Sequence, residues 1–307
     1  MKKTLFIGAF LVGSLIGLRA QNTSEGVATV DSKKVGYKTF NLQHRKEGDP
    51  VLVFEPGLGG GTFDPILALL PDTISGIQYE RSGLGKSELD LGLTSDAQLV
   101  DRLHGLLVAL KIKPPYLLVG HSIGGPYIRL FASKYPTEVS GLVFLDPTDF
   151  MLTADEDEKA RIQSGSGTGY RKTFAAVLKA MSQNSNFGSG AHNDAKRAMA
   201  SNGDGYFPEY ANLPRLENIA VTVVISYNKY IEAPDEEMNK KLKLGIDFKP
   251  WWKQYDDLRI SHYCDLIKDN DRSSIVLLPK YSHGLYYQDP KLIAKLVIEN
   301  YNNAKKP

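Results

Sequence analysis

The chain of 307 residues contains a single cysteine, Cys264. A disulfide within the chain is therefore impossible, and a thiol cluster that binds zinc is excluded. A large excess of charge of either sign is also missing, since 37 Lys and Arg residues face 35 Asp and Glu residues. Without a basic excess, the composition argues against binding of nucleic acid or of anionic lipid.

Long hydrophobic runs are scarce, and the clearest one lies at the N-terminus. A basic start, Met1-Lys2-Lys3, precedes 15 mostly apolar residues at 4–18, and Leu18-Arg19-Ala20 offers a small residue at a cleavage point. This run is shorter than the ~20 residues that a membrane-spanning helix needs. The pattern predicts a secretory signal peptide over residues 1–20, with an uncleaved anchor as the alternative.

Cleavage after Ala20 would remove Lys2, Lys3 and Arg19, which changes the net charge from +2 to −1. The mature chain would then be close to neutral, with no stable membrane span. Export together with the lack of disulfides favours a bacterial periplasm or the extracellular space over a eukaryotic secretory route. We therefore expect an exported protein.

Apolar strands alternate with helices along most of the chain. This alternation predicts an α/β fold with a mostly parallel sheet covered by helices on both faces. An antiparallel pair at 27–30 and 35–42 is expected at one edge of the sheet. The other expected strands are 51–54, 76–79, 116–119, 142–145, 221–225 and 275–278, and the expected helices are 95–110, 126–135, 251–268 and 289–301.

The alternation breaks between residues 150 and 215. This region begins with the acidic run Asp155–Glu158, and we expect two amphipathic helices in it, at 170–182 and 192–201. We interpret the region as an inserted cap over the carboxyl edge of the sheet. The core is then formed by residues 21–149 and 216–307, in which we expect a second irregular segment at 227–250.

The most informative segment is Gly120-His121-Ser122-Ile123-Gly124, which directly follows the apolar residues 116–119. A serine hydroxyl is a poor nucleophile, so an enzyme that uses one must expose it beside a base and near donors that stabilise an anion. A tight strand-to-helix turn exposes the serine, and glycines are needed around it because a Cβ there would collide across the turn. The segment therefore predicts Ser122 as a nucleophile.

Three strand ends carry the residue types that acyl transfer needs. Ser122 follows one strand, Asp146 ends the next, and His283 follows the last. In this arrangement the imidazole takes the proton of the serine hydroxyl, and the carboxylate fixes the imidazole tautomer. The backbone N–H groups of Leu58 and Ile123 are candidates for the oxyanion hole, because one lies in a glycine-rich turn and the other at a helix N-terminus.

These segments resemble the α/β-hydrolase superfamily, in particular its cap-containing members that are serine esterases or similar to lipases. The resemblance covers about residues 25–305 outside the cap. Pro56 stands where the family usually has a histidine, and Glu80 where it has an aspartate. The segments that carry the resemblance are 54–60 (FEPGLGG), 79–87 (YERSGLGKS), 120–125 (GHSIGG) and 282–284 (SHG).

The identity of the acid stays open. In many members of the superfamily it follows the strand after the cap, where this chain has no carboxylate at the expected short distance and offers only Glu232 and Asp235. In members that resemble haloalkane dehalogenases the acid ends the strand after the nucleophile, which is the place of Asp146. Asp149 is a further candidate, and Asp146 could instead cap the following turn.

The resemblance implies a serine hydrolase, most simply a carboxylesterase that acts on a small-molecule ester. It would form an acyl-Ser122 intermediate and need neither a metal nor an organic cofactor. Hydrolysis of a carbon–carbon bond, an amide or a thioester is the alternative within enzymes. A ligand-binding protein on the hydrolase scaffold is the alternative outside them. A haloalkane dehalogenase is disfavoured because it would have Asp in place of Ser122, and the sequence leaves the acyl group, the alcohol and the oligomeric state open.

Overall fold

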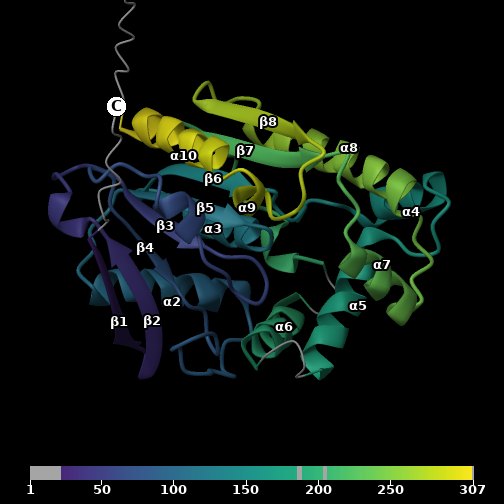
Figure 1. Ribbon diagram of the computed structural model, residues 1–307, viewed down its shortest axis with the longest axis horizontal. Helices are drawn as coiled ribbons and strands as arrows, with labels where there is room; N and C mark the ends of the chain where they lie inside the picture. The colour runs from purple at the N-terminus through teal and green to yellow at the C-terminus, as the bar shows by residue number, and fades with distance from the viewer. Residues whose placement is uncertain (1–21, 185–188, 203–205, 306–307) are drawn as a thin grey trace, which may run out of the picture.

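The computed structural model describes residues 22–184, 189–202 and 206–305, so the predicted signal peptide at 1–20 lies outside the described residues. In the described part, eight strands form one sheet of order β1-β2-β4-β3-β5-β6-β7-β8 (Figure 1). Strand β2 runs antiparallel to β1 and β4, and the remaining neighbours are parallel. The predicted α/β class and the antiparallel pair at the edge are confirmed.

The strands are β1 (Thr23–Val30), β2 (Lys33–Phe40), β3 (Val51–Glu55), β4 (Gly76–Tyr79), β5 (Tyr116–His121), β6 (Val139–Leu145), β7 (Ala220–Tyr227) and β8 (Ser273–Pro279). The helices are α1 (Asp64–Leu67), α2 (Asp96–Ala109), α3 (Gly124–Lys134), α4 (Ala154–Gln163), α5 (Tyr170–Gln183), α6 (Ser189–Asn202), α7 (Ala233–Leu242), α8 (Phe248–Ile267), α9 (Leu285–Gln288) and α10 (Pro290–Ala304), with short 3-10 turns η1 (Leu42–His44) and η3 (Pro208–Tyr210).

The core consists of two apolar layers, one on each face of the sheet. Successive side chains of a strand point to opposite faces, so Val51 and Val53 of β3 join one layer and Leu52 and Phe54 join the other. Helices α2, α3 and α8 cover the first layer, and α1, α9 and α10 cover the second. Figure 1 shows α2 and α10 on opposite sides of the strands.

Helix α2 begins where its capping residues predict. The hydroxyl of Ser95 accepts from the backbone N–H of Gln98 at 3.1 Å, and the side chain of Gln98 accepts from the N–H of Ser95 at 3.1 Å. Each side chain thereby satisfies a donor that the first turn leaves unpaired. Helix α3 begins at Gly124, two residues before the predicted start at Pro126, because proline is tolerated within a first turn as well as at its beginning.

In the described residues of the insertion between β6 and β7 there are three α-helices, α4 to α6, where two were expected. The acidic run belongs to α4, which starts with a capping box of Thr153 and Glu156 and keeps its acidic residues at the positive end of the helix dipole. The predicted limits of the cap, residues 150 and 215, lie in loops.

A helix also replaces part of the segment at 227–250 that was expected to be irregular. Helix α7 starts after Glu232, has a proline in its first turn, and carries Lys240 and Lys241 in its last turn. These are ordinary signals for a helix start and end. Helix α8 begins at Phe248, three residues before its predicted start.

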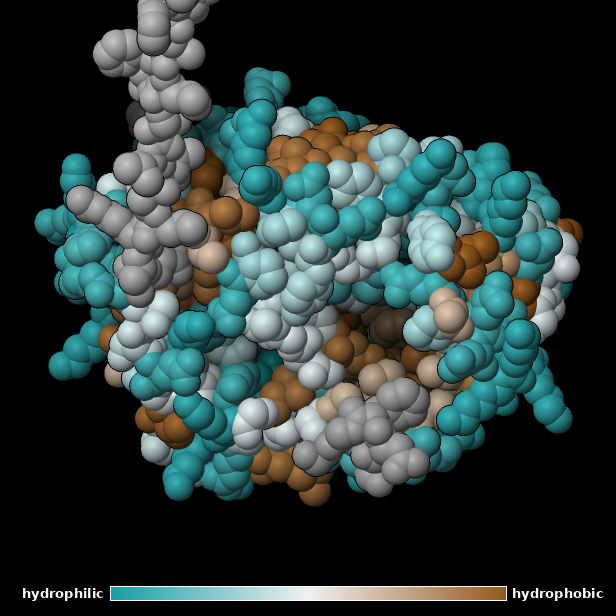
Figure 2. Space-filling model, in the orientation of Figure 1, coloured by the Kyte–Doolittle hydropathy of each residue, from teal (hydrophilic) through white to brown (hydrophobic). Residues whose placement is uncertain are grey.

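The inserted helices lie at one end of the sheet. Figure 1 shows α5 and α6 of the insertion beside α7, which follows β7, and Figure 2 shows on this face a hollow lined with brown, apolar atoms. Trp251 and Tyr255 of α8 form a separate apolar cluster with Leu152 and Ala160, which joins α8 to the start of the insertion. Within the described residues, no helix is both long enough and apolar enough to cross a membrane.

Candidate active site

Ser122 occupies a strained turn between β5 and α3. Its φ of 55° lies in the left-handed region, which a residue with a side chain rarely adopts. Two glycines make the turn possible: a Cβ at Gly120 would lie 2.5 Å from the carbonyl O of Gly124, and a Cβ at Gly124 would lie 2.4 Å from the carbonyl O of Glu55. The turn leaves Ser122 partly exposed at the carboxyl end of β5.

Backbone hydrogen bonds join this turn to the end of β6. The N–H of Ser122 donates to the carbonyl O of Leu145 at 3.1 Å, and the N–H of Thr148 donates to the carbonyl O of Ser122 at 3.0 Å. Asp146 lies between these two partners and also has a positive φ, of 42°. The nucleophile candidate and the acid candidate are therefore held at adjacent strand ends.

His283 reaches the same place from the loop after β8. Its Nδ1 lies 2.6 Å from Oδ2 of Asp146, and its side chain is 50% exposed while that of Asp146 is fully buried. Because a carboxylate only accepts, Nδ1 is the donor in this hydrogen bond, and Nε2 takes no part in it. The described residues include no hydrogen bond between the Ser122 hydroxyl and this imidazole, and such a bond commonly tightens only when substrate binds.

Two of the other three acid candidates have different partners, and the third, Glu232, is the N-cap residue of α7. Asp235 accepts from the backbone N–H of Glu232 at 3.3 Å within the capping box of α7. Asp149 lies 2.8 Å from Nδ1 of His262. Of the four candidates, only Asp146 contacts His283 in the described part of the chain.

Asp146 has three further partners that the sequence did not predict. The backbone N–H of Ser226 donates to its Oδ1 at 2.9 Å, Arg259 Nη1 lies 3.0 Å from the same oxygen, and Lys229 Nζ lies 3.2 Å from Oδ2. Burial alone would raise the pKa of Asp146, but the charges of Arg259 and Lys229 and the hydrogen bond to His283 hold it well below its ordinary value. The acid is therefore ionised.

The two cations are balanced by a second buried carboxylate. Asp256 Oδ1 lies 2.8 Å from Arg259 and 3.8 Å from Lys229. The ammonium of Lys229 also lies over the ring of Trp252, 4.0 Å from its centroid, in a cation–π contact. Two carboxylates and two cations thus form a buried quartet. In the sequence, only the pair of Asp256 and Arg259, three residues apart on α8, could have indicated it.

His121 supports the loop that carries His283. Its Nε2 donates to the carbonyl O of His283 at 2.9 Å, and the two imidazole centroids are 4.6 Å apart. Burial, and then the charge of His283, lower the pKa of His121 to about 3. The ring is therefore neutral, and its hydrogen bond orders the loop that carries His283.

The two oxyanion candidates have free donors. Among the described residues, the backbone N–H groups of Leu58 and Ile123 have no hydrogen-bond partner. Leu58 lies in the turn after β3, and Ile123 is the N-cap residue of α3. A Cβ on Gly57, which directly precedes Leu58, would lie 3.3 Å from Cβ of Ser122, so the turn passes directly beside the serine.

An open cleft of about 920 Å³ lies on the exposed side of His283. Its walls include His121 and the tyrosines Tyr230, Tyr286 and Tyr287. The volume lies within the range of small-molecule sites. Residues 22–184, 189–202 and 206–305 contain no group of three or more His, Cys, Asp or Glu side chains placed to hold a metal ion.

Comparisons with known proteins agree with this architecture. The family model of the alpha/beta hydrolase fold matches residues 50–232. Human monoacylglycerol lipase ABHD6 is 25% identical over 238 residues, which cover 73% of this chain and 67% of that protein. The crystal structure of the enol-lactonase from Burkholderia xenovorans LB400 superposes with a TM-score of 0.57 at 17% identity, covering 90% of this chain and 100% of the other, and shows the shared fold.

Uncharacterized protein YqjL of Bacillus subtilis (strain 168) is 34% identical over 148 residues, or 46% of this chain. The chain spans only 58% of the length of YqjL, and 17% and 16% of two further relatives. The family model, in contrast, matches more than half of the chain. With the eight-stranded, mostly parallel sheet and its helical insertion, this match shows that the chain belongs to the α/β-hydrolase fold family.

Proposed function

We propose that the protein is an exported serine hydrolase that cleaves acyl esters. The observation that carries the proposal is the 2.6 Å hydrogen bond between His283 and the buried Asp146, beside the strained turn of Ser122. An imidazole that is oriented by an ionised carboxylate is the base that a serine nucleophile needs.

In the proposed reaction, the Ser122 hydroxyl oxygen attacks the acyl carbon while Nε2 of His283 takes the hydroxyl proton. The N–H groups of Leu58 and Ile123 hold the negative charge that develops on the carbonyl oxygen. The bond to the alcohol oxygen then breaks, and the alcohol leaves with the proton from His283. A water molecule attacks the acyl-Ser122 in the same way, which releases the carboxylic acid and restores the hydroxyl.

Ester substrates of small to medium size are supported by two observations. The cleft at His283 has room for a leaving group of substantial size, and its tyrosines offer both ring faces and hydroxyls. Similarity to a protein named monoacylglycerol lipase, over 73% of this chain, agrees with an ester bond.

The proposal is tested with p-nitrophenyl esters of increasing acyl length. Wild-type protein should hydrolyse at least one of them, and Ser122→Ala should lose at least about 10³-fold in kcat with unchanged circular dichroism. Equal rates for the two proteins would refute Ser122 as the nucleophile.

Export is tested separately by N-terminal sequencing of the protein from expressing cells. The sequence should begin at Gln21, and an intact N-terminus would contradict cleavage of the signal peptide.

A second function is favoured by the cations beside Asp146. Lys229 and Arg259 both contact the acid, and their charge weakens the negative field that it directs at His283. A ligand-binding protein with slow turnover would fit this arrangement. Tight binding of one compound, together with no hydrolysis of esters, thioesters or amides, would favour that reading over the enzyme.

A further inference from the structure

The buried guanidinium of Arg81 lies under the turn that carries Leu58. All five of its N–H groups find acceptors. Nε donates to Oδ1 of Asp194 at 3.1 Å, and Nη1 donates to Glu55 at 2.6 Å and to the carbonyl O of Pro56 at 2.7 Å. Nη2 donates to the carbonyl O of Gly57 at 2.5 Å and to Oδ2 of Asp194 at 2.6 Å. The side chain is completely inaccessible to solvent.

The contact with Gly57 bears directly on the candidate oxyanion donor. The carbonyl of Gly57 and the N–H of Leu58 belong to one peptide plane, in which they point in opposite directions. A guanidinium that holds the carbonyl therefore also fixes the direction of the N–H. Since Gly57 borders Cβ of Ser122, this direction decides whether the N–H can meet an oxyanion formed at the serine.

The other side of the turn is held by the cap. Asp194 lies on α6, and its Oδ2 accepts from the backbone N–H of Gly59 at 2.8 Å. Burial would raise the pKa of Asp194, but the charges of Arg81 and Arg197 lower it to about 2, so the carboxylate is charged. The peptide groups on both sides of Leu58 thus depend on Arg81 and on one residue of the cap.

We propose that Arg81 and Asp194 are positioning residues of the oxyanion hole, so that the cap holds the Leu58 N–H in place as well as covering the substrate. This inference rests on the serine-hydrolase function proposed above. It gives α6 a role in catalysis, whereas the sequence predicted this segment only as part of the cap.

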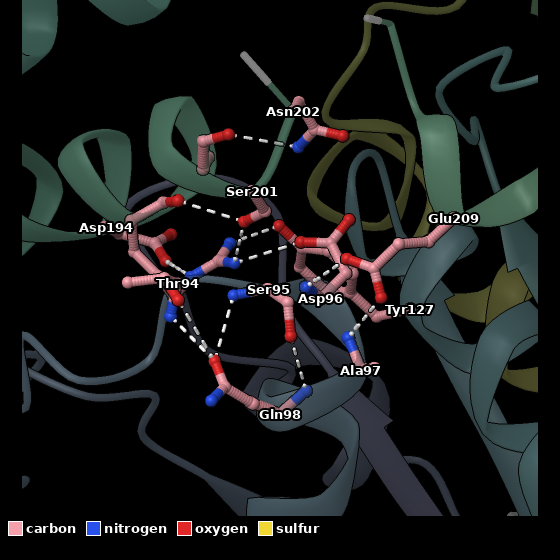
Figure 3. Close-up of polar contacts among 12 residues, drawn as sticks. Thr94, Ser95, Asp96, Ala97, Gln98, Tyr127, Asp194, Ser201, Asn202 and Glu209 are labelled. Atoms are coloured by element: carbon pink, nitrogen blue, oxygen red, sulfur yellow. Dashed lines mark hydrogen bonds and ion pairs between the residues drawn. The ribbon is translucent and has the colours of Figure 1, made fainter.

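A second ion pair between α6 and the core supplies the control. Arg197 of α6 lies 3.0 Å from Asp96 at the start of α2 and also donates to the hydroxyl of Tyr127. Figure 3 shows these contacts between the cap and the core, together with Glu209, which accepts from the N–H of Asp96 and Ala97 at 2.8 and 3.0 Å. Arg197 Nε also lies 3.5 Å from Oδ1 of Asp194, and Asp96→Asn leaves that pair in place. The variant therefore weakens a buried ion pair between cap and core, while Asp96 itself has no direct contact with the turn.

The experiment compares Asp194→Asn with Asp96→Asn on the best p-nitrophenyl ester. For Asp194→Asn we expect kcat to fall about 10- to 100-fold with KM within about threefold, since loss of one oxyanion donor costs about 10²- to 10³-fold. Affinity for a trifluoromethyl ketone, which forms a tetrahedral adduct, should fall by a similar factor. Asp96→Asn should keep kcat within about threefold. If Asp194→Asn does not fold, Asp194→Glu, which moves the charge by one methylene, gives the same comparison.

Hydrogen–deuterium exchange of the segment 57–61 is measured in parallel, because it tests the positioning even if no ester is hydrolysed. We expect faster exchange in Asp194→Asn and wild-type exchange in Asp96→Asn. The inference is overturned by unchanged exchange in Asp194→Asn, by unchanged kcat in that variant of an active enzyme, or by equal losses of kcat in both. Absence of wild-type activity would instead refute the proposed function.

Discussion

At the scale of single residues, the acid candidates differ sharply in their surroundings. Asp146 is buried and bonded to His283, whereas Asp235 caps a helix. We predict that Asp146→Asn lowers kcat by about 10⁴-fold, because the amide stabilises the wrong imidazole tautomer. Asp235→Asn should stay within about twofold. Steady-state kinetics on one ester decides between them, and a larger loss for Asp235→Asn would contradict the assignment.

The quartet around Asp146 gives a second prediction at this scale. Lys229→Met leaves two buried carboxylates facing one cation, which should lower the free energy of unfolding by about 3 kcal/mol. Adding Asp256→Asn removes the extra negative charge and should recover at least about 1 kcal/mol. Urea unfolding of both variants measures this coupling.

Lys253→Met is the control for the first substitution, because Lys253 forms an exposed pair with Asp257, and it should change the stability by less than about 0.5 kcal/mol. Additive effects of Lys229→Met and Asp256→Asn would mean that the quartet is not coupled.

The sequence could not predict this cluster, since Lys229 and Arg259 reach Asp146 from separate elements. The strand ends that carry Ser122, Asp146 and His283 were predictable because parallel strands bring their carboxyl ends to one edge.

At the scale of elements, His262 ties α8 to the start of the insertion. Its Nδ1 lies 2.8 Å from Asp149 and its Nε2 lies 3.3 Å from Glu156 of α4. Burial would lower the pKa of His262, but the hydrogen bonds and charges of these two carboxylates raise it to about 9. The protonated ring thus bridges two elements that are far apart in the sequence.

This bridge predicts a pH dependence of stability. A histidine whose pKa is higher in the folded state stabilises the fold fully below its unfolded value of about 6.5, and loses that effect as the pH rises through about 9. Between these values wild-type protein should lose on the order of 2 kcal/mol more than His262→Gln in urea unfolding. His44→Gln, at an exposed site, should keep the wild-type slope. A wild-type slope in His262→Gln would contradict the bridge.

The elements were predictable to different degrees. The buried strands and α2 followed from apolar runs and from the capping residue Ser95. Helix α4 was not predicted, because its first turn is acidic and it has only a weak apolar face. Thr153 and Glu156, which form its capping box, were the available signal. Helix α7 was missed because it buries none of its side chains, so no apolar periodicity marks it.

At the scale of the whole molecule, the cap and the core share buried charges. Arg81 and Asp194 are 113 positions apart in the sequence, and Arg197 and Asp96 are 101 positions apart. No periodicity or motif pairs such residues, because the pairing depends on how the insertion folds back over the sheet. The sequence predicted a cap over the carboxyl edge of the sheet. The structure adds that Asp194 of the cap contacts the turn beside Ser122.

The account depends on Ser122 being a nucleophile that His283 activates. The most direct measurement is mass-spectrometric mapping of the adduct formed with a fluorophosphonate probe. We predict one adduct, on Ser122, absent from Ser122→Ala and formed at least about 100-fold more slowly by His283→Ala. An adduct on another residue, or undiminished labelling of Ser122→Ala, would contradict the account.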